Sequence, residues 1–164
     1  MLLRAAELGL RPALVPALLI VMNLAYAIVA YVSGLFADRG ARSGGGRAWL
    51  LYPGFLFLIL AYGLLIAAHE PWHCFTAAVA WGVHLGMTQG VMPTIVADLA
   101  PAERRGTAFG AYHLALGVTA LPAGAIAGVL WQAHGADATF LFGSGLTVFA
   151  LAAFALWNLR FGKL

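Results

Sequence analysis

The sequence predicts an all-α membrane protein with five transmembrane helices. Hydrophobic residues make up 63% of the 164 residues and charged residues only 9%, whereas soluble globular proteins contain roughly 45–50% and about 25%. A chain of this length cannot hide so much apolar surface in its own interior. Charged residues also divide the chain into five uncharged stretches, each long enough to cross a bilayer. The expected solvent is therefore lipid, and the lipid bilayer is the first expected partner.

The five uncharged stretches are residues 12–37, 48–69, 71–97, 106–136 and 138–159. A crossing needs about 20 apolar residues, with a rise of about 1.5 Å for each residue. The first stretch is longer than the apolar region of a secretory signal, which has roughly 7–15 residues, and is interpreted as a true span. The predicted helices cover residues 13–36, 48–68, 72–97, 106–131 and 139–159.

Proline and glycine mark the ends of several predicted helices. Pro71 suits the first turn of the third helix, where the missing N–H costs nothing. Pro101 follows the end of the third helix, and Gly135 ends the fourth. Pro93 and Pro122 lie within spans, where packed neighbours can compensate for the lost hydrogen bond.

The basic residues predict the orientation of the chain. Seven of the nine Lys and Arg residues fall on one side of the predicted helices, and two fall on the other. Cytoplasmic segments are enriched in Lys and Arg, so the C-terminus is expected to be cytoplasmic and Met1 outside. The basic side holds Arg39, Arg42, Arg47, Arg104, Arg105, Arg160 and Lys163, and the other side holds Arg4 and Arg11.

Several other function classes receive no support from the sequence. Nucleic acid binding requires a basic face with stacking aromatic residues, and the basic residues here are scattered between apolar runs. A single cysteine, Cys74, cannot form an internal disulfide. No cofactor is expected, and the protein is not expected to be an enzyme.

One motif resembles a zinc-binding pattern. His69-Glu70-Pro71-Trp72-His73 matches H-E-x-x-H, in which both histidines must lie on one helical face. Pro71 is expected to start a helix, which leaves His69 in the preceding turn, and no third ligand is apparent nearby. An intramembrane zinc metalloprotease is therefore a weaker alternative, and no metal site is expected.

Polar side chains within the predicted spans indicate a cavity. A polar group in a bilayer is costly and usually faces protein or water. The second and fifth spans carry few such groups. The candidate cavity or substrate residues lie on the first, third and fourth spans and are Asn23, His84, Thr88, Gln89 and His113.

Two stripes of small residues predict close helix packing. Small residues spaced four apart allow two helix backbones to approach each other in lipid. The third span carries one stripe and the fourth span carries the other. The candidate packing residues are Gly82, Gly86, Gly90, Gly117, Gly124 and Gly128.

A segment between the first two spans resembles a known loop signature. Gly34-x-x-x-Asp38-Arg39-x-x-Arg42 is similar to the cytoplasmic G-x-x-x-D-R-x-G-R-R/K motif of the major facilitator superfamily. Ala41 and Ser43 stand where that motif has a glycine and a basic residue. The family motif implies a conformational latch in which Asp38 contacts a helix terminus or an arginine.

A second segment resembles the same family. It is similar to the cytoplasmic loop that enters the family's eleventh helix, and it contains Asp98, Pro101, Arg104, Arg105 and Gly106. The sequence that follows, through Gly117, Pro122, Gly124, Gly128 and Trp131, is similar to that helix itself. The resemblance covers most of the chain from residue 13 to residue 160.

The resemblance implies that the five spans correspond to helices eight to twelve of a twelve-helix transporter, within a six-helix bundle. Residues 1–11 would be the remnant of a preceding helix with an outside loop, residues 12–160 the five-span bundle, and residues 161–164 a cytoplasmic tail. Helices nine and twelve of the family lie at the lipid-facing periphery, which implies the same place for residues 48–68 and 139–159.

The resemblance also implies a function. The expected activity is transport of a small molecule by alternating access, driven by a coupling ion, in a bacterial inner membrane. The N-terminal half of the transporter is expected as a further partner, because family binding sites lie between two halves. The alternative from a different class is a small helical membrane scaffold or assembly protein.

Overall fold

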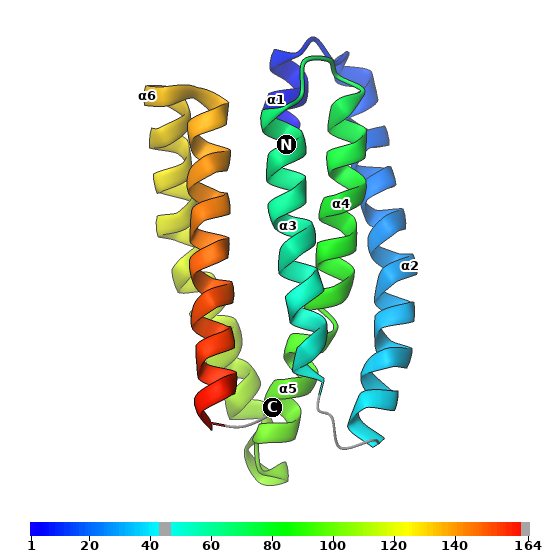
Figure 1. The fold of residues 1–164 in the computed structure, drawn as a ribbon, viewed down its shortest axis with the longest axis vertical. Coiled ribbons are helices and arrows are strands. Elements are labelled where there is room, and N and C mark those ends of the chain that lie inside the picture. Colours follow the sequence, from blue (N-terminus) through cyan, green and yellow to red (C-terminus); the bar gives the residue numbers. More distant parts are fainter. Residues whose placement is uncertain (43–46, 162–164) are drawn as a thin grey trace.

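The structure is a computed structural model that describes residues 1–42 and 47–161, and within those ranges it is helical and contains no β-strand. Figure 1 shows long helices side by side, with the N-terminus in the upper part of the bundle and the C-terminus at its lower end. The helices are α1 (Leu2–Glu7), α2 (Val15–Arg42), α3 (Leu51–Ile66), α4 (His73–Thr88), α5 (Val91–Leu99) and α6 (Arg105–Phe161), with short 3-10 turns η1 (Pro12–Leu14), η2 (Ala48–Leu50) and η3 (Ala102–Arg104).

Helix α6 is a hairpin of two antiparallel arms, which we call the N-terminal arm (residues 105–134) and the C-terminal arm (residues 136–161). The chain reverses at Gly135, where φ is 81° and ψ is −175°. This region of backbone space is essentially restricted to glycine, because a side chain would collide with the backbone. The fourth predicted helix therefore ends at Gly135, as its sequence indicates, and the predicted 106–131 and 139–159 helices correspond to the two arms.

The predicted helix at residues 72–97 is interrupted in the structure. Helix α4 ends at Thr88, and α5 begins at Val91 after a turn at Gln89 and Gly90. Pro93 has no N–H to donate to the carbonyl of Gln89, one turn earlier, and its ring crowds that carbonyl. Gly90 further disfavours a continuous helix. The single third span is therefore divided into two shorter helices.

Three helices of the described residues are long and apolar enough to cross a membrane, namely Pro12–Gly40, Ala48–Ile66 and Ala102–Arg160. The last of these contains both arms of α6. Helix α4 has 16 residues and α5 has 9, so neither reaches a full crossing by itself. These lengths and compositions support a multi-pass membrane protein.

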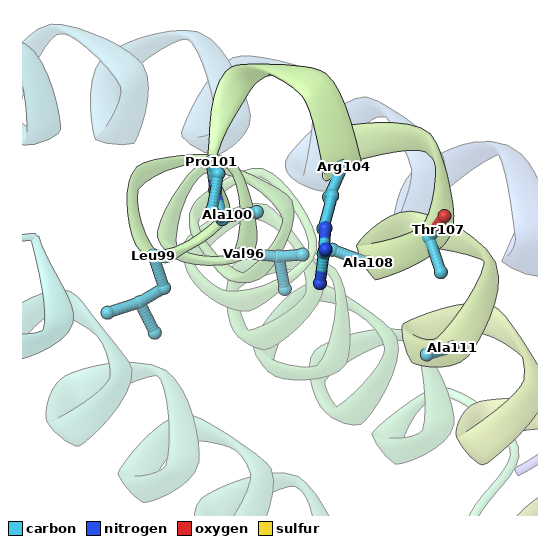
Figure 2. Close-up of a pocket in the computed structure, with 8 residues that line it drawn as sticks. All are labelled: Val96, Leu99, Ala100, Pro101, Arg104, Thr107, Ala108 and Ala111. Carbon is cyan, nitrogen blue, oxygen red and sulfur yellow. The ribbon is translucent and has the colours of Figure 1, made fainter.

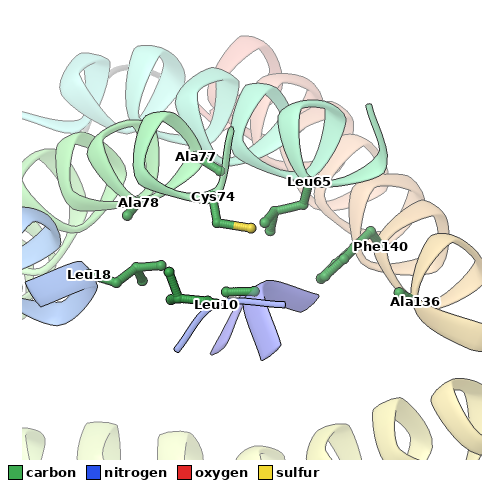
Figure 3. Close-up of a cluster of buried hydrophobic side chains, with 9 residues drawn as sticks. Leu10, Leu18, Leu65, Cys74, Ala77, Ala78, Ala136 and Phe140 are labelled. Atoms are coloured by element: carbon green, nitrogen blue, oxygen red, sulfur yellow. The ribbon is translucent and has the colours of Figure 1, made fainter. Parts of the chain in front are cut away.

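Two clusters of buried apolar side chains hold the bundle at different levels. Figure 3 shows the first, where Cys74 of α4 and Leu65 of α3 point toward each other, and Phe140 of α6 lies nearby. This cluster joins α1, α2, α3, α4 and the C-terminal arm of α6. The second lies around the start of α3 and consists of Ala37, Ala48, Leu50, Leu51 and Val91.

Helices α2 and α4 make the closest approach through two glycines. A Cβ atom at Gly82 would lie 2.3 Å from the carbonyl oxygen of Met22, and one at Gly86 would lie 2.9 Å from the backbone nitrogen of Ala30. Gly90 has only a distant neighbour, at 4.0 Å. No described atom lies within 4 Å of such a Cβ at Gly117, Gly124 or Gly128. The packing role of those four glycines stays a prediction.

Helix α3 is the most buried of the three helices that are long enough to cross a membrane. Helix α3 packs against both α4 and α6. Of its most apolar 18-residue stretch, 28% is buried, compared with 6% for residues 12–40 and 11% for residues 102–160. Within the described chain, α3 therefore contacts helices on two sides, and the place of residues 48–68 at the lipid-facing periphery of the whole transporter stays a prediction.

Candidate functional site

A cavity of about 410 Å³ lies among α3, α4, α5 and the N-terminal arm of α6. Four of the five candidate cavity residues line it, from two different helices and the turn between α4 and α5. Its volume lies within the range of about 300–1,000 Å³ that is typical of small-molecule sites. The lining residues are Phe55, His84, Thr88, Gln89, Met92, Pro93, Tyr112, His113 and Leu116.

His84 is the most firmly positioned of these side chains. Its Nδ1 lies 2.9 Å from the carbonyl oxygen of Gly54 on α3. A carbonyl can only accept, so Nδ1 must carry a proton, and the neutral ring then has a free lone pair on Nε2. The ring of Phe55 lies beside the imidazole, at a centroid distance of 5.9 Å. The hydrogen bond thus fixes both the tautomer and the orientation of the ring at the cavity.

Gly54 allows this hydrogen bond to form. A Cβ atom there would lie 2.9 Å from Cγ2 of Thr88 and 3.1 Å from Cβ of Met87. The absence of a side chain lets α3 approach α4 closely enough for the carbonyl of Gly54 to reach His84. The sequence analysis did not identify Gly54 as a site residue, because its sequence neighbours are mostly apolar and the search was based on polar side chains.

The other polar residues of the cavity differ in how they are engaged. The Thr88 hydroxyl donates to the carbonyl of His84 at 2.8 Å, so it is satisfied within its own helix. The Gln89 and His113 side chains are exposed and have no hydrogen-bond partner among the described residues. The ring of Tyr112 lies next to that of His113, with centroids 5.1 Å apart. Gln89 and His113 are therefore available to a ligand.

Asn23 does not line this cavity. It lies on α2, its side chain is exposed, and its Nδ2 donates to the carbonyl of Leu19 one turn earlier, at 2.8 Å. A polar side chain in a span can satisfy itself in this way. The structure thus brings four of the five candidates together and leaves Asn23 apart.

Sequence reasoning missed the apolar and aromatic walls of the cavity. Phe55, Met92, Pro93, Tyr112 and Leu116 line it, but such residues are common throughout this chain. Only Tyr112 could have been predicted as a lining residue, and only weakly, because it is adjacent to the candidate His113 in the sequence.

Charged residues gather at the end of the bundle that holds the C-terminus. Arg47 pairs with Asp98, at the end of α5, and its Nη2 lies 3.9 Å from a carboxylate oxygen of Asp38 on α2. The Arg47 side chain is only 20% exposed, whereas the two carboxylates are more than half exposed. One arginine thus connects the ends of α2 and α5, which lie far apart in the sequence.

The first family motif is helical, whereas the sequence interpretation placed it in a loop. Gly34, Asp38 and Arg39 all lie on the last turns of α2, which continues to Arg42. The side chain of Arg42 lies outside the described residues. The guanidinium of Arg39 lies over the ring of Phe36, 5.8 Å from its centroid. The segment up to Arg42 contains no proline, and α2 continues through both Gly34 and Gly40.

The second family segment surrounds the turn between α5 and α6. Pro101 and Arg104 line a cavity of about 390 Å³ with apolar residues of both helices. Figure 2 shows their side chains around this turn. Arg105 is the first residue of α6, and Gly106 follows it with no described atom within 4 Å of a Cβ at that position. Asp98 links this second segment to the first family motif, because Arg47 pairs with both Asp98 and Asp38.

The zinc-like motif has a structural role. Nδ1 of His73 accepts the backbone N–H groups of His69 and Glu70, each at 3.3 Å. This arrangement satisfies two free donors just before α4. Among the described residues, no group of three or more His, Cys, Asp or Glu side chains is placed to hold a metal ion.

A second charged network, which the sequence analysis did not identify, joins α1 to α6. Arg4 lies 3.3 Å from Asp137 and also donates to the carbonyl of Ala68. Glu7 accepts the indole N–H of Trp131 at 3.0 Å. These contacts tie the N-terminal helix to both arms of the α6 hairpin, on either side of its reversal.

Comparison with known proteins gives three findings. The sequence profile of the Major Facilitator Superfamily matches residues 1–163. A protein of Methanocaldococcus jannaschii, described as an uncharacterised MFS-type transporter, is 29% identical over 137 residues, which cover 80% of this chain and 32% of the relative. No solved structure is significantly similar to the chain. The chain thus spans about a third of the length of that relative.

Proposed function

The chain belongs to the major facilitator superfamily, and from this premise we propose that it is the C-terminal part of a secondary transporter that moves a small molecule by alternating access. Family membership confirms the resemblance seen in the sequence and supports a membrane transporter. The finer points, namely the substrate, the coupling ion, the complementary half and the inner-membrane location, belong to this proposal.

The convergence of His84, Gln89 and His113 on one cavity carries the proposal. A purely structural helix bundle in a membrane has no need to turn three polar side chains toward one cavity, two of them without a hydrogen-bond partner among the described residues, because such groups are costly in lipid. In the proposed mechanism, Nε2 of His84 and the free groups of Gln89 and His113 bind the substrate or relay a proton. Histidine suits this role because its ordinary pKa lies near neutrality.

We also propose that the chain crosses the membrane five times. The crossings are α2, α3, α4 with α5, and the two arms of α6. The combined span of α4 and α5 covers residues 73–99, which exceeds the roughly 20 residues of a crossing. Broken helices of this kind are common at the substrate sites of transporters. In this proposal residues 1–11 belong to a preceding helix and its outside loop, and residues 161–164 form a cytoplasmic tail.

The Arg47 contacts support a latch at the proposed cytoplasmic end. Asp38 and Asp98 lie at the ends of helices on either side of Arg47, so movement of α5 relative to α2 must break at least one pair. Both carboxylates are more than half exposed, and ion pairs open to solvent contribute about 0–1 kcal/mol each. The latch is thus weak enough to open during a transport cycle.

The latch predicts that Arg47→Gln speeds amide hydrogen exchange in residues 91–99, because α5 loses its tie to α2. Asp98→Asn should have the same effect. Arg105→Gln is the matched control, since Arg105 lies at the same end and has no ion pair among the described residues. Equal exchange in α5 for all three variants and the parent chain would exclude the latch.

The cavity predicts that His84→Leu and Gln89→Leu each reduce transport several-fold. The full-length transporter that contains this chain would be expressed in cells and screened for flux with a panel of labelled small molecules. Thr94→Val is the control. The Thr94 hydroxyl donates a hydrogen bond to the carbonyl of Val91, and the residue lines none of the described cavities. Loss of protein level with full activity per molecule would show that the replaced residue serves packing only.

The proposed orientation predicts the labelling pattern of two single cysteines in a Cys74→Ala background. Glu103 lies in η3, two residues before the N-terminal arm begins, His134 is the last residue of that arm, and both are exposed. An impermeant thiol reagent added to intact cells should label His134→Cys and leave Glu103→Cys unlabelled until the membrane is opened. The reverse pattern, or equal labelling of both, would contradict the orientation.

A further inference from the structure

The His84 cavity and the cavity of about 390 Å³ at Arg104 lie end to end between α5 and the N-terminal arm of α6. On each side, lining residues of the two cavities follow one another at intervals of four, and residues spaced in this way share one face of a helix. The two faces consist of Met92, Val96 and Ala100 on the side of α5, and of Leu116, Tyr112, Ala108 and Arg104 on the side of α6. The cavities are therefore parts of one groove, which we call the α5–α6 groove. It leads from His84 to the end of the bundle where Arg47 pairs with Asp98.

Arg104 places a positive charge at the outer end of the α5–α6 groove. Among the described residues that line the groove, it is the only Arg, Lys, Asp or Glu, and its guanidinium has no hydrogen bond or ion pair with another described residue. Figure 2 shows its side chain extending beside Ala108. The two nearest carboxylates in the sequence do not line the groove, because Asp98 pairs with Arg47 and Glu103 is exposed outside it. The charge at this end is therefore unbalanced.

The remainder of the α5–α6 groove is apolar at its outer end and offers hydrogen-bond donors at its inner end. All neighbours of Arg104 in the cavity lining are apolar except Thr107. At the inner end, the Gln89 amide and the His113 imidazole each carry an N–H group, and neither side chain has a partner among the described residues. A carboxylate or a similar anionic group accepts hydrogen bonds from such donors.

We propose that the α5–α6 groove is the access route to the transport site from the proposed cytoplasmic side, and that the substrate is an organic anion with an apolar body. This inference rests on the proposed function. Arg104 attracts the anionic group at the outer end, since a charge at the entrance of a cleft raises the local concentration of its counter-ion. The apolar walls contact the body of the substrate, and Gln89 and His113 donate to its anionic group at the inner end. Arg104 repels a cation, and an inorganic anion would lose its hydration against the walls.

The charge selectivity of the groove can be measured with two thiol reagents of similar size and opposite charge. A single cysteine, Ala108→Cys in a Cys74→Ala background, would be placed in the full-length transporter that contains this chain. Inside-out membrane vesicles would be treated with sulfonatoethyl or trimethylammonioethyl methanethiosulfonate, and each rate would be divided by the rate with a free thiol. We expect the anionic reagent to react faster on this scale. Arg104→Gln should lower the ratio of the anionic to the cationic rate about three- to tenfold, because the charge acts on the two reagents in opposite directions.

Two matched controls test whether the effect belongs to the groove. Arg105→Gln should leave the ratio nearly unchanged, because Arg105 is adjacent in the sequence but lines neither cavity. At Leu114→Cys, which is exposed on the same arm and also outside both cavities, Arg104→Gln should not alter the ratio. A soluble probe extends the test to substrate chemistry. 1-Naphthoate should slow the modification of Ala108→Cys, whereas 1-naphthamide, which has the same rings and no charge, should not.

Several outcomes would overturn the inference. Equal scaled rates for the two reagents, a ratio that is unaffected by Arg104→Gln, or no protection by 1-naphthoate would show that the groove does not select anions. No reaction of Ala108→Cys with either charged reagent or with neutral methyl methanethiosulfonate would show that another helix fills the groove. Slower reaction of the neutral reagent after addition of phosphatidylglycerol would identify a lipid site. None of these readouts requires flux, whereas failure of the proposed function would appear as unchanged flux in His84→Leu and Gln89→Leu.

Discussion

Replacing Gly86 by leucine is expected to prevent the normal packing of α2 against α4. A Cβ atom at this position would lie 2.8 Å from Cβ of Val29 and 2.9 Å from backbone atoms of Tyr26 and Ala30. Backbone atoms cannot move aside as a flexible side chain can, so the two helices must separate. Overpacking costs about 1–3 kcal/mol, and the backbone contacts place Gly86→Leu at the upper end. This corresponds to a fall of about 10 °C in the unfolding temperature.

Thermal unfolding of the purified chain in detergent would measure this effect. Gly117→Leu is the matched control, because Gly117 lies in a helix, is exposed and has no described atom within 4 Å of a Cβ at its position. Its unfolding temperature should equal that of the parent chain or rise slightly, since leucine favours helix more than glycine does. An unchanged unfolding temperature for Gly86→Leu would show that α2 and α4 do not meet at this glycine.

Replacing Gly135 by valine is expected to open the α6 hairpin. The backbone at Gly135, with φ of 81° and ψ of −175°, lies in a region that costs other residues about 1–3 kcal/mol or more, and a β-branched side chain fits it worst. The variant can relieve this strain by straightening α6 around residue 135. The two arms would then no longer lie side by side.

A distance between spin labels would report the change. Leu121 and Phe149 are exposed and lie on different arms. Packed helix axes lie about 8–10 Å apart, whereas 28 residues of continuous helix span about 42 Å. We expect a short distance in the parent chain and a longer, broader distribution in Gly135→Val. Gly128→Val, at a helical glycine of the N-terminal arm, should keep the short distance, and a short distance in both variants would contradict the role of Gly135.

The sequence was sufficient to predict the helical membrane character, the family and the end of a helix at Gly135. These features depend on composition, on the length of apolar runs and on one residue with unusual backbone freedom. The break between α4 and α5 was within reach of the same reasoning, because Gly90 and Pro93 are both visible in the sequence. It was missed because a proline within a span is often tolerated, and only packing decides whether the helix continues.

The candidate residues were found by polarity, but the sequence could not determine which of them meet. Helical periodicity shows which residues share one face of a helix, whereas it does not show which helix lies opposite. His84 contacts Gly54, 30 residues earlier, and Arg47 contacts Asp98, 51 residues later. Asn23 has the same polarity as the cavity residues, yet it lies apart from them and bonds within its own helix.

The sequence by itself thus determined the lipid solvent, most of the helices and the family of this protein, because each follows from local composition or from short motifs. Only the tertiary structure decided the packing of α3 against both α4 and α6 and the meeting of His84, Gln89 and His113 at one cavity. Both depend on where backbones can approach closely. In an apolar chain, the fit between glycines and side chains that are distant in the sequence decides which helix backbones come close. The pattern of polar residues does not predict this fit.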